Sequence, residues 1–321
     1  MNWLLLAVVP FFFALNPVIG RALIDSFGPA TLSVVRWSLS AAVIGVVAAV
    51  RGPAERWQAP PLLMLRIALL GAMGMGLCAY AAFIAAHTAE ATNIALIYGC
   101  AAALVAAWEI GAGRQRASPS LLFGVAACMF GAFLILTRGH PGILRDWTFV
   151  AGDLWAAAGM LMFVVYTIAL RRVPMALSAM PQFVVMAGAA SLALVPFAAA
   201  EIAASGRPPL DEGTLPWLAA VVLFAGIGAF LGYNIALARN GPVLTSASLS
   251  LTPIFAALLA IALLGEQLFW YHGFALALVV TGLLLINRGR AVPATGKVLP
   301  DNVAPVPSKS LRWPPDRLFG R

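Results

Sequence analysis

The chain has 321 residues, of which 62% are hydrophobic and only 10% are charged, and its mean hydropathy is +0.94. Ordinary globular domains are about one quarter charged, so this composition excludes a water-soluble domain and indicates an integral membrane protein. The net charge of +8 does not indicate nucleic-acid binding, because the basic residues lie in short loops and in the C-terminal tail without interleaved aromatic residues.

Ten apolar segments follow one another along the chain, each close to the roughly 20 residues that a helix needs to cross the hydrocarbon core. They cover residues 3–24, 31–50, 62–86, 91–109, 119–137, 151–172, 178–201, 215–238, 244–264 and 270–288. A cleaved signal peptide is the alternative for the first segment, but no basic stretch precedes it and no small-residue cleavage motif follows it. The sequence therefore predicts an all-α membrane protein with ten transmembrane helices.

Two polar residues lie inside the first two segments. Asn16, followed by Pro17, is costly at this depth unless it faces protein or water, so we expect it to contact the substrate. Arg36 is the only charged residue placed well inside a segment. Its guanidinium can extend to the membrane surface, pair with another residue or attract an anionic group. We expect a structural or gating role for it, through a specific partner.

Tyrosine falls almost entirely within the predicted helices. Tyr80, Tyr98 and Tyr166, together with Asn234 of the eighth segment, are predicted to line a cavity suited to small zwitterions or moderately apolar solutes. The alternative for Tyr166 is a core position, because an aromatic and soft stripe recurs along the sixth segment at helical spacing.

The ninth segment combines hydroxyl residues with a proline. Ser246, Ser250 and Pro253 are spaced by four and three residues, which places them on one helix face. The proline lacks an amide hydrogen, so the helix is expected to kink or widen there. Ser246 and Ser250 are predicted to bind substrate, with close helix packing as the alternative, and Pro253 and Glu266 to have structural or gating roles.

The distribution of basic residues predicts the orientation. With the N-terminus in the cytoplasm, only Arg138, Arg145 and Arg207 lie in outer loops, against fourteen basic residues in the inner loops and tail. Both termini are therefore predicted to be cytoplasmic, in the inner membrane. The proline-rich tail, residues 289–321, is predicted to be disordered.

The two halves of the chain show weak similarity to each other. An offset of 154 aligns Ala102, Leu104 and Ala106 with Ala256, Leu258 and Ala260. Five helices followed by five enter the second half from the opposite side of the membrane, which gives an inverted repeat, a common architecture of secondary transporters. The predicted repeats are residues 1–138 and 151–288.

Several stretches resemble the EamA-type branch of the drug/metabolite transporter superfamily. They are "LSVVRWSLSAAVIG", "GIGAFLGYNIALARNGPVLTSASLSLTPIFAALLAIALLGEQ" and "YHGFALALVVTGLLLINR". Arg36, Pro253, Gly265 and Glu266 carry the family pattern. The first half departs from it, because Gly99-Cys100 replaces the usual proline of the fourth helix. The resemblance implies a ten-helix transporter that moves small metabolites such as amino acids, often outward, by alternating access at the repeat interface.

Other classes of function find little support in the sequence. His87, His140 and His272 stand without partners at useful spacing, which argues against an enzyme, a metal site or a cofactor. No acidic residue lies near the middle of a segment, so the sequence does not support coupling to protons. The three cysteines are interpreted as packing residues. The expected partners are a small-molecule substrate and the lipid bilayer, a homodimer is left open, and the alternative function is a non-transporting structural or regulatory membrane protein.

Overall fold

The computed structural model describes residues 3–50, 57–113, 115–140, 150–170, 173, 177–206, 208, 210–230, 232–233, 236 and 248–290. Every regular element within these residues is helical. Eight helices are long and apolar enough to cross a membrane, and two shorter apolar helices, Thr214–Gly228 and Thr252–Leu264, lie where the eighth and ninth segments are predicted. The structure thus confirms the predicted all-α fold. Residues 291–321, most of the tail predicted to be disordered, lie outside the described residues.

The helices of the first half match the predicted segments closely. They are α1 (Trp3–Leu23), α2 (Pro29–Val50), the run of α3 (Pro61–Gly71), η2 (Ala72–Leu77) and α4 (Cys78–Ala85), the pair α5 (Ala91–Gly99) and α6 (Ala101–Gly111), and α7 (Pro119–Leu136). Three of them begin at a proline, whose fixed φ suits the first turn and whose missing N–H would have no partner there anyway. These prolines therefore mark helix starts in the sequence.

The second half repeats this order. Its helices are α9 (Ala151–Leu170), α10 (Ala179–Ser205), α11 (Thr214–Ala220) with η3 (Val221–Gly228), η4 (Leu249–Leu251) with α13 (Thr252–Leu264), and α14 (Trp270–Arg290). The helix α13 ends at Gly265, which has a φ of 67°. Glycine adopts this left-handed conformation without a Cβ clash, so it is the usual residue after a helix end.

Departures from regular α-helical geometry occur in the third and fourth helices of both halves. The third helix of each half contains a π-helical stretch, Ala72–Leu77 in the first and Val221–Gly228 in the second. In the fourth helices, the chain is interrupted at Cys100 in the first half, and the 3₁₀ turn Leu249–Leu251 leads into α13 in the second. Such widened or broken turns free backbone carbonyls and recur at functional sites. Their matching positions agree with a structural repeat.

Pro253 lies in the first turn of α13, directly after the 3₁₀ turn. The expected bend of the ninth segment therefore takes the form of a change from 3₁₀ to α geometry, and the missing N–H of the proline costs little at a helix start. A Cβ added to Gly99 of the fourth helix would lie 3.2 Å from Cγ of Pro253. The interruption of the fourth helix thus lies against the first turn of α13.

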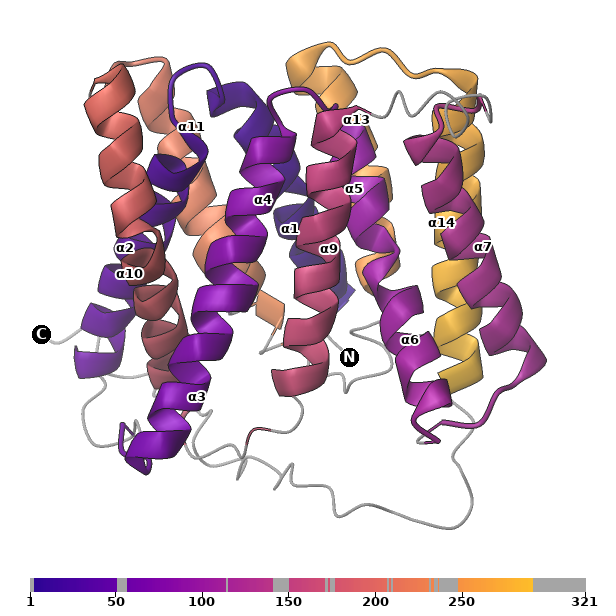
Figure 1. The fold of residues 1–321 in the computed structure, drawn as a ribbon, viewed down its shortest axis with the longest axis horizontal. Coiled ribbons are helices and arrows are strands. Elements are labelled where there is room, and N and C mark those ends of the chain that lie inside the picture. The colour runs from indigo at the N-terminus through magenta and orange to yellow at the C-terminus, as the bar shows by residue number, and fades with distance from the viewer. Residues whose placement is uncertain are drawn as a thin grey trace, which may run out of the picture.

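Neighbouring helices come from different halves of the chain. Figure 1 shows the helices side by side, with α7 next to α14 at one edge and α2 near α10 at the other. Glycines allow α7 and α14 to approach closely, because a Cβ on Gly124 would lie 2.7 Å from the carbonyl oxygen of Gly282. Small residues at such contacts let helix backbones pack in the absence of a hydrophobic driving force between lipid-exposed helices.

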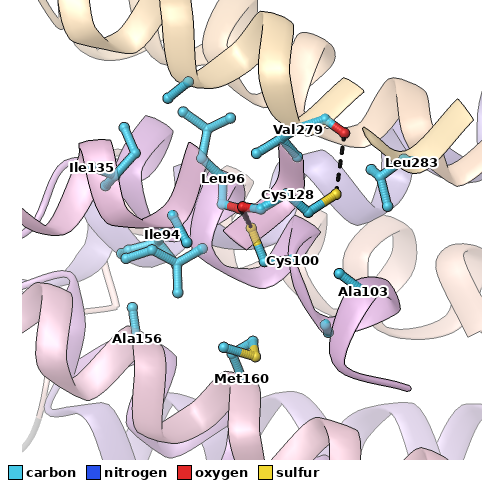
Figure 2. Close-up of a cluster of buried hydrophobic side chains, with 14 of the residues drawn as sticks. Ile94, Leu96, Cys100, Ala103, Cys128, Ile135, Ala156, Met160, Val279 and Leu283 are labelled. Atoms are coloured by element: carbon cyan, nitrogen blue, oxygen red, sulfur yellow. Dashed lines mark hydrogen bonds between the residues drawn. The ribbon is translucent and has the colours of Figure 1, made fainter. Parts of the chain in front are cut away.

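The cysteines lie within this packing. Figure 2 shows Cys100 and Cys128 among buried aliphatic side chains of α5, α9 and α14. The Cys100 thiol donates to the carbonyl oxygen of Cys128 at 3.1 Å, and the Cys128 thiol reaches the carbonyl oxygen of Val279 at 3.6 Å. All three cysteines are free and buried. They occupy packing positions, as the sequence suggested.

Candidate functional site

Arg36 of α2 makes a network of contacts in the interior. Its side chain is 3% exposed, its Nη1 donates to Oδ1 of Asn16 on α1, and its Nη2 donates to the carbonyl oxygen of Ala225 at 2.9 Å. The guanidinium carbon lies 4.2 Å from the centre of the Trp37 ring. The arginine therefore joins the first two helices to a helix of the second half.

The acceptor at Ala225 lies in the π-helical stretch of the eighth segment. A second residue of α2, Ser40, donates to the carbonyl oxygen of Val222 in the same stretch at 3.4 Å. The wide turn thus supplies carbonyl groups to two polar side chains of α2. Nε of Arg36 and Nε1 of Trp37 are buried and have no hydrogen-bond partner.

Two of the predicted tyrosines lie close to this network. The Tyr98 hydroxyl donates to the carbonyl oxygen of Cys78 at 3.0 Å. Cys78 is also within electrostatic reach of Arg36 and of Tyr166. Tyr166 is buried, and a Cβ on Gly74 of the other π-helical stretch would collide with its ring. Asn16 thus contacts Arg36, and Tyr98 contacts Cys78, a residue that the sequence marks only as a packing position.

The remaining predicted substrate-binding residues do not join this group within the described residues. Tyr80 instead packs on Phe197 of α10, with ring centres 5.8 Å apart. Asn234, Ser246 and the side chain of Ser250 lie outside the described residues. The substrate-binding role expected for these residues stays a prediction.

Glu266 lies at one end of the bundle, which we call the upper end. At this end α1 joins α2, α4 joins α5 and α13 joins α14, and it is at the top of Figure 1. The Glu266 carboxylate accepts from the backbone N–H groups of Ala91 at 2.6 Å and Thr92 at 3.2 Å, and from the Thr92 hydroxyl at 2.9 Å. A carboxylate is stabilised at a helix N-terminus, and here it binds the end of the ninth helix to the start of the fourth.

A second carboxylate makes the same contact elsewhere at the upper end. Glu201 of α10 accepts from the N–H of Ala30 at 2.9 Å and from both the N–H and the hydroxyl of Thr31 at 2.8 Å. Each carboxylate thus caps a helix of the first half from a helix of the second. We call these contacts the Glu266 cap and the Glu201 cap. The sequence carries a signal for them, because an Ala-Thr pair lies in the first turn of both α2 and α5.

One histidine has partners that the sequence did not reveal. Nε2 of His272 lies 2.9 Å from Oδ1 of Asn93 and 3.3 Å from Oε2 of Glu90. The expectation that His272 stands alone is therefore wrong, because the start of α14 meets the start of α5 at the upper end. Among the described residues, no group of three or more histidine, cysteine, aspartate or glutamate side chains could hold a metal ion.

Comparisons with known proteins agree with this architecture. The sequence profile of the EamA-like transporter family matches residues 1–137 and 150–288. No curated protein matches the chain significantly. A solved structure described only as "Crystal structure of protein" superposes with a TM-score of 0.57 at 19% identity, over 89% of this chain and 97% of that one. At this identity the likeness concerns the fold alone.

Proposed function

The chain belongs to the EamA-like transporter family and is a membrane transporter of the drug/metabolite type, and from this premise we propose that it exports small amphipathic metabolites such as amino acids. In this proposal the substrate path runs between the two halves and opens alternately to either side. Inverted-repeat transporters commonly bind their substrates near the bilayer midplane at the interface between the repeats.

We place the upper end outside the cell, with both termini in the cytoplasm of the inner membrane. The excess of basic residues in the inner loops and tail supports this orientation. Arg138, one of the three basic residues of the outer loops, lies just beyond α7 at the upper end.

The observation that carries alternating access is the pair of carboxylate caps. Both caps join the two halves, and both lie at the upper end. In this proposal the two caps close the outer side, and outward opening has to break them.

The network around Arg36 supports the substrate class. A buried guanidinium without a carboxylate partner is costly in a membrane, and polar groups alone offset this cost only in part. Unpartnered donors on Arg36 and on Trp37 lie close together here, beside an aromatic surface. A small solute with a carboxylate group and an apolar part would satisfy both features.

Transport by the purified protein in proteoliposomes tests the proposal. We expect saturable flux of labelled amino acids, competition by other carboxylate-bearing solutes, and weaker competition by the matching amides. Substitution of Arg36 is compared with Arg21→Ala as the control. Arg21 donates to the carbonyl oxygen of Ala86 near the helix ends and not in the interior. An absence of saturable flux across amino acids, nucleosides and amphiphilic cations would favour the non-transporting alternative.

A further inference from the structure

A buried group of titratable side chains lies at the upper end, outside the Arg36 network. It consists of Asn93 at the start of α5, Asp153 at the start of α9, His272 at the start of α14, and Glu90 just before α5. Nδ2 of Asn93 donates to Oδ1 of Asp153 at 3.2 Å, and Asp153 and His272 are each 1% exposed. We call these four residues the upper cluster.

The hydrogen bonds of the upper cluster assign a donor or acceptor role to each nitrogen of His272. The backbone N–H of Phe269 donates to Nδ1 of His272 at 3.0 Å, so this nitrogen carries no hydrogen. Nε2 of the neutral ring must therefore carry the hydrogen, and it donates to Oδ1 of Asn93 at 2.9 Å. The amide nitrogen of Asn93 then faces Asp153 as a donor. The imidazole is neutral in this arrangement, because both of its nitrogens are fixed by their partners.

Two carboxylate oxygens in the upper cluster have no donor. Oδ2 of Asp153 is buried without a hydrogen-bond partner, and so is Oε2 of Glu90. The latter is 3.3 Å from Nε2 of His272, but the single hydrogen on that nitrogen points to Asn93. A buried carboxylate oxygen without a donor is among the costliest polar groups in a protein.

The charges of Asp153 and of the groups around it do not sum to zero. Glu90 before α5, His272 of α14 and Arg138 after α7 lie within electrostatic range of it. Tyr271, the next titratable neighbour, is uncharged in its phenol form and faces the same groups. Two carboxylates, one guanidinium and one neutral imidazole carry a net charge of −1. A single proton on Oδ2 of Asp153 neutralises the upper cluster and supplies its missing hydrogen.

We propose that the upper cluster is the proton-binding site that couples transport to a proton gradient, with Asp153 as the group that takes up the proton. The inference rests on the proposed transport function and names its coupling ion. A proton from water binds Oδ2 of the carboxylate, and no other bond forms or breaks. The Glu90 side chain is 33% exposed, so the upper cluster borders water at the upper surface.

The position of the upper cluster explains how a proton acts on the transport cycle. Glu90 and Asn93 belong to the first half, whereas Asp153 and His272 belong to the second. Outward opening separates the two pairs and exposes them to water. Ala91 and Thr92, the two residues held by the Glu266 cap, lie between Glu90 and Asn93 in the same helical turn. Proton binding and closure of the upper end therefore involve the same turn.

The first test needs no substrate. Reconstituted protein labelled with [¹³C]aspartate is titrated with acid while infrared spectroscopy records the carbonyl stretch of protonated carboxyl groups. We expect a label-shifted band from a solvent-shielded aspartic acid that is lost in Asp153→Asn and retained in Asp25→Asn. Asp25 is the matched control because it is an exposed aspartate at the same end. A band that survives in Asp153→Asn overturns the proposal.

The labelled wild-type protein decides the matter even if Asp153→Asn does not fold, because the absence of any solvent-shielded protonated aspartate overturns the site. The second test measures flux of a labelled amino acid in proteoliposomes. We expect an imposed proton gradient to accelerate wild-type flux about tenfold and to leave Asp153→Asn flux unchanged. A tenfold ratio corresponds to about 1.4 kcal/mol. Acceleration by a sodium gradient instead would overturn the proposal. If no solute is transported, the infrared result still stands, so failure of transport is distinguished from failure of the proton site.

Discussion

The Glu201 cap and the Glu266 cap make the same contact at two places in the molecule. In each, one carboxylate binds two consecutive N–H groups and a threonine hydroxyl at the start of a helix. Glu201 belongs to the last turns of α10, whereas Glu266 follows the left-handed Gly265 after α13 has ended. The same hydrogen bonds are thus built from a helical residue in one case and from a helix-terminating turn in the other.

The surroundings of the two caps differ. Gly28 precedes α2, and a Cβ there would collide with the Glu201 carboxylate. Close packing therefore leaves no room for a side chain beside the Glu201 cap. Glu90 precedes α5 and contacts His272, so the other cap adjoins the upper cluster. The Glu201 cap therefore depends on close packing, whereas the Glu266 cap shares its helical turn with titratable groups.

Removal of both carboxylates is expected to have the largest effect. In Glu201→Gln/Glu266→Gln each amide places an N–H donor against backbone N–H donors, which costs about 1.5 kcal/mol per cap. The loss of both caps should therefore shift the equilibrium toward the outward-open state about a hundredfold. The reporter is Val18→Cys, because Val18 is buried with Ala91 and Ala260 near the Glu266 cap. With the native cysteines replaced by alanine, an impermeant thiol reagent should label this cysteine only when both caps are removed. Equal labelling with intact caps would break the interpretation of the caps as closing contacts.

The next largest effect is expected from Gly28→Ala. The added methyl group displaces the Glu201 carboxylate from its donors, so we expect a loss of about 1.5 to 3 kcal/mol, the range for hydrogen bonds to charged groups. Thermal unfolding in detergent measures this loss. The control is Gly45→Ala within α2, where nothing lies within 4 Å of the new methyl group. This control should be neutral or slightly stabilising, because alanine favours a helix. Similar losses in both variants would show that crowding at the Glu201 cap is not the cause.

The smallest effect is expected from removal of one hydroxyl donor in each cap. Thr31→Val and Thr92→Val leave the backbone N–H groups in place, so each should cost about 0.5 to 1.5 kcal/mol in unfolding free energy. The two losses should agree, since the hydroxyl-to-carboxylate distances are 2.8 Å and 2.9 Å. Denaturant titrations compare them directly. A clearly larger loss for Thr92→Val would show that the upper cluster strengthens the Glu266 cap, and would sharpen the comparison.

The candidate site was only partly predictable. Asn16 and Arg36 stood out because polar groups at membrane depth are rare, and the structure joins them by a hydrogen bond. Cys78 gave no such signal, since a free cysteine inside an apolar segment is usually a packing residue. Nothing in the local sequence of Glu201 or Asp153 identifies their partners.

The sequence by itself determined the ten apolar segments, most of their ends and the all-α fold. These follow from local physics, because a helix in lipid satisfies its own backbone and its length must match the hydrocarbon core. Only the tertiary structure decided which helix ends meet. Glu201 binds Thr31 across 170 positions of the chain, and His272 binds Asn93 across 179. Such contacts depend on how two five-helix halves pack against each other, and the hydropathy of a single segment carries no record of that packing.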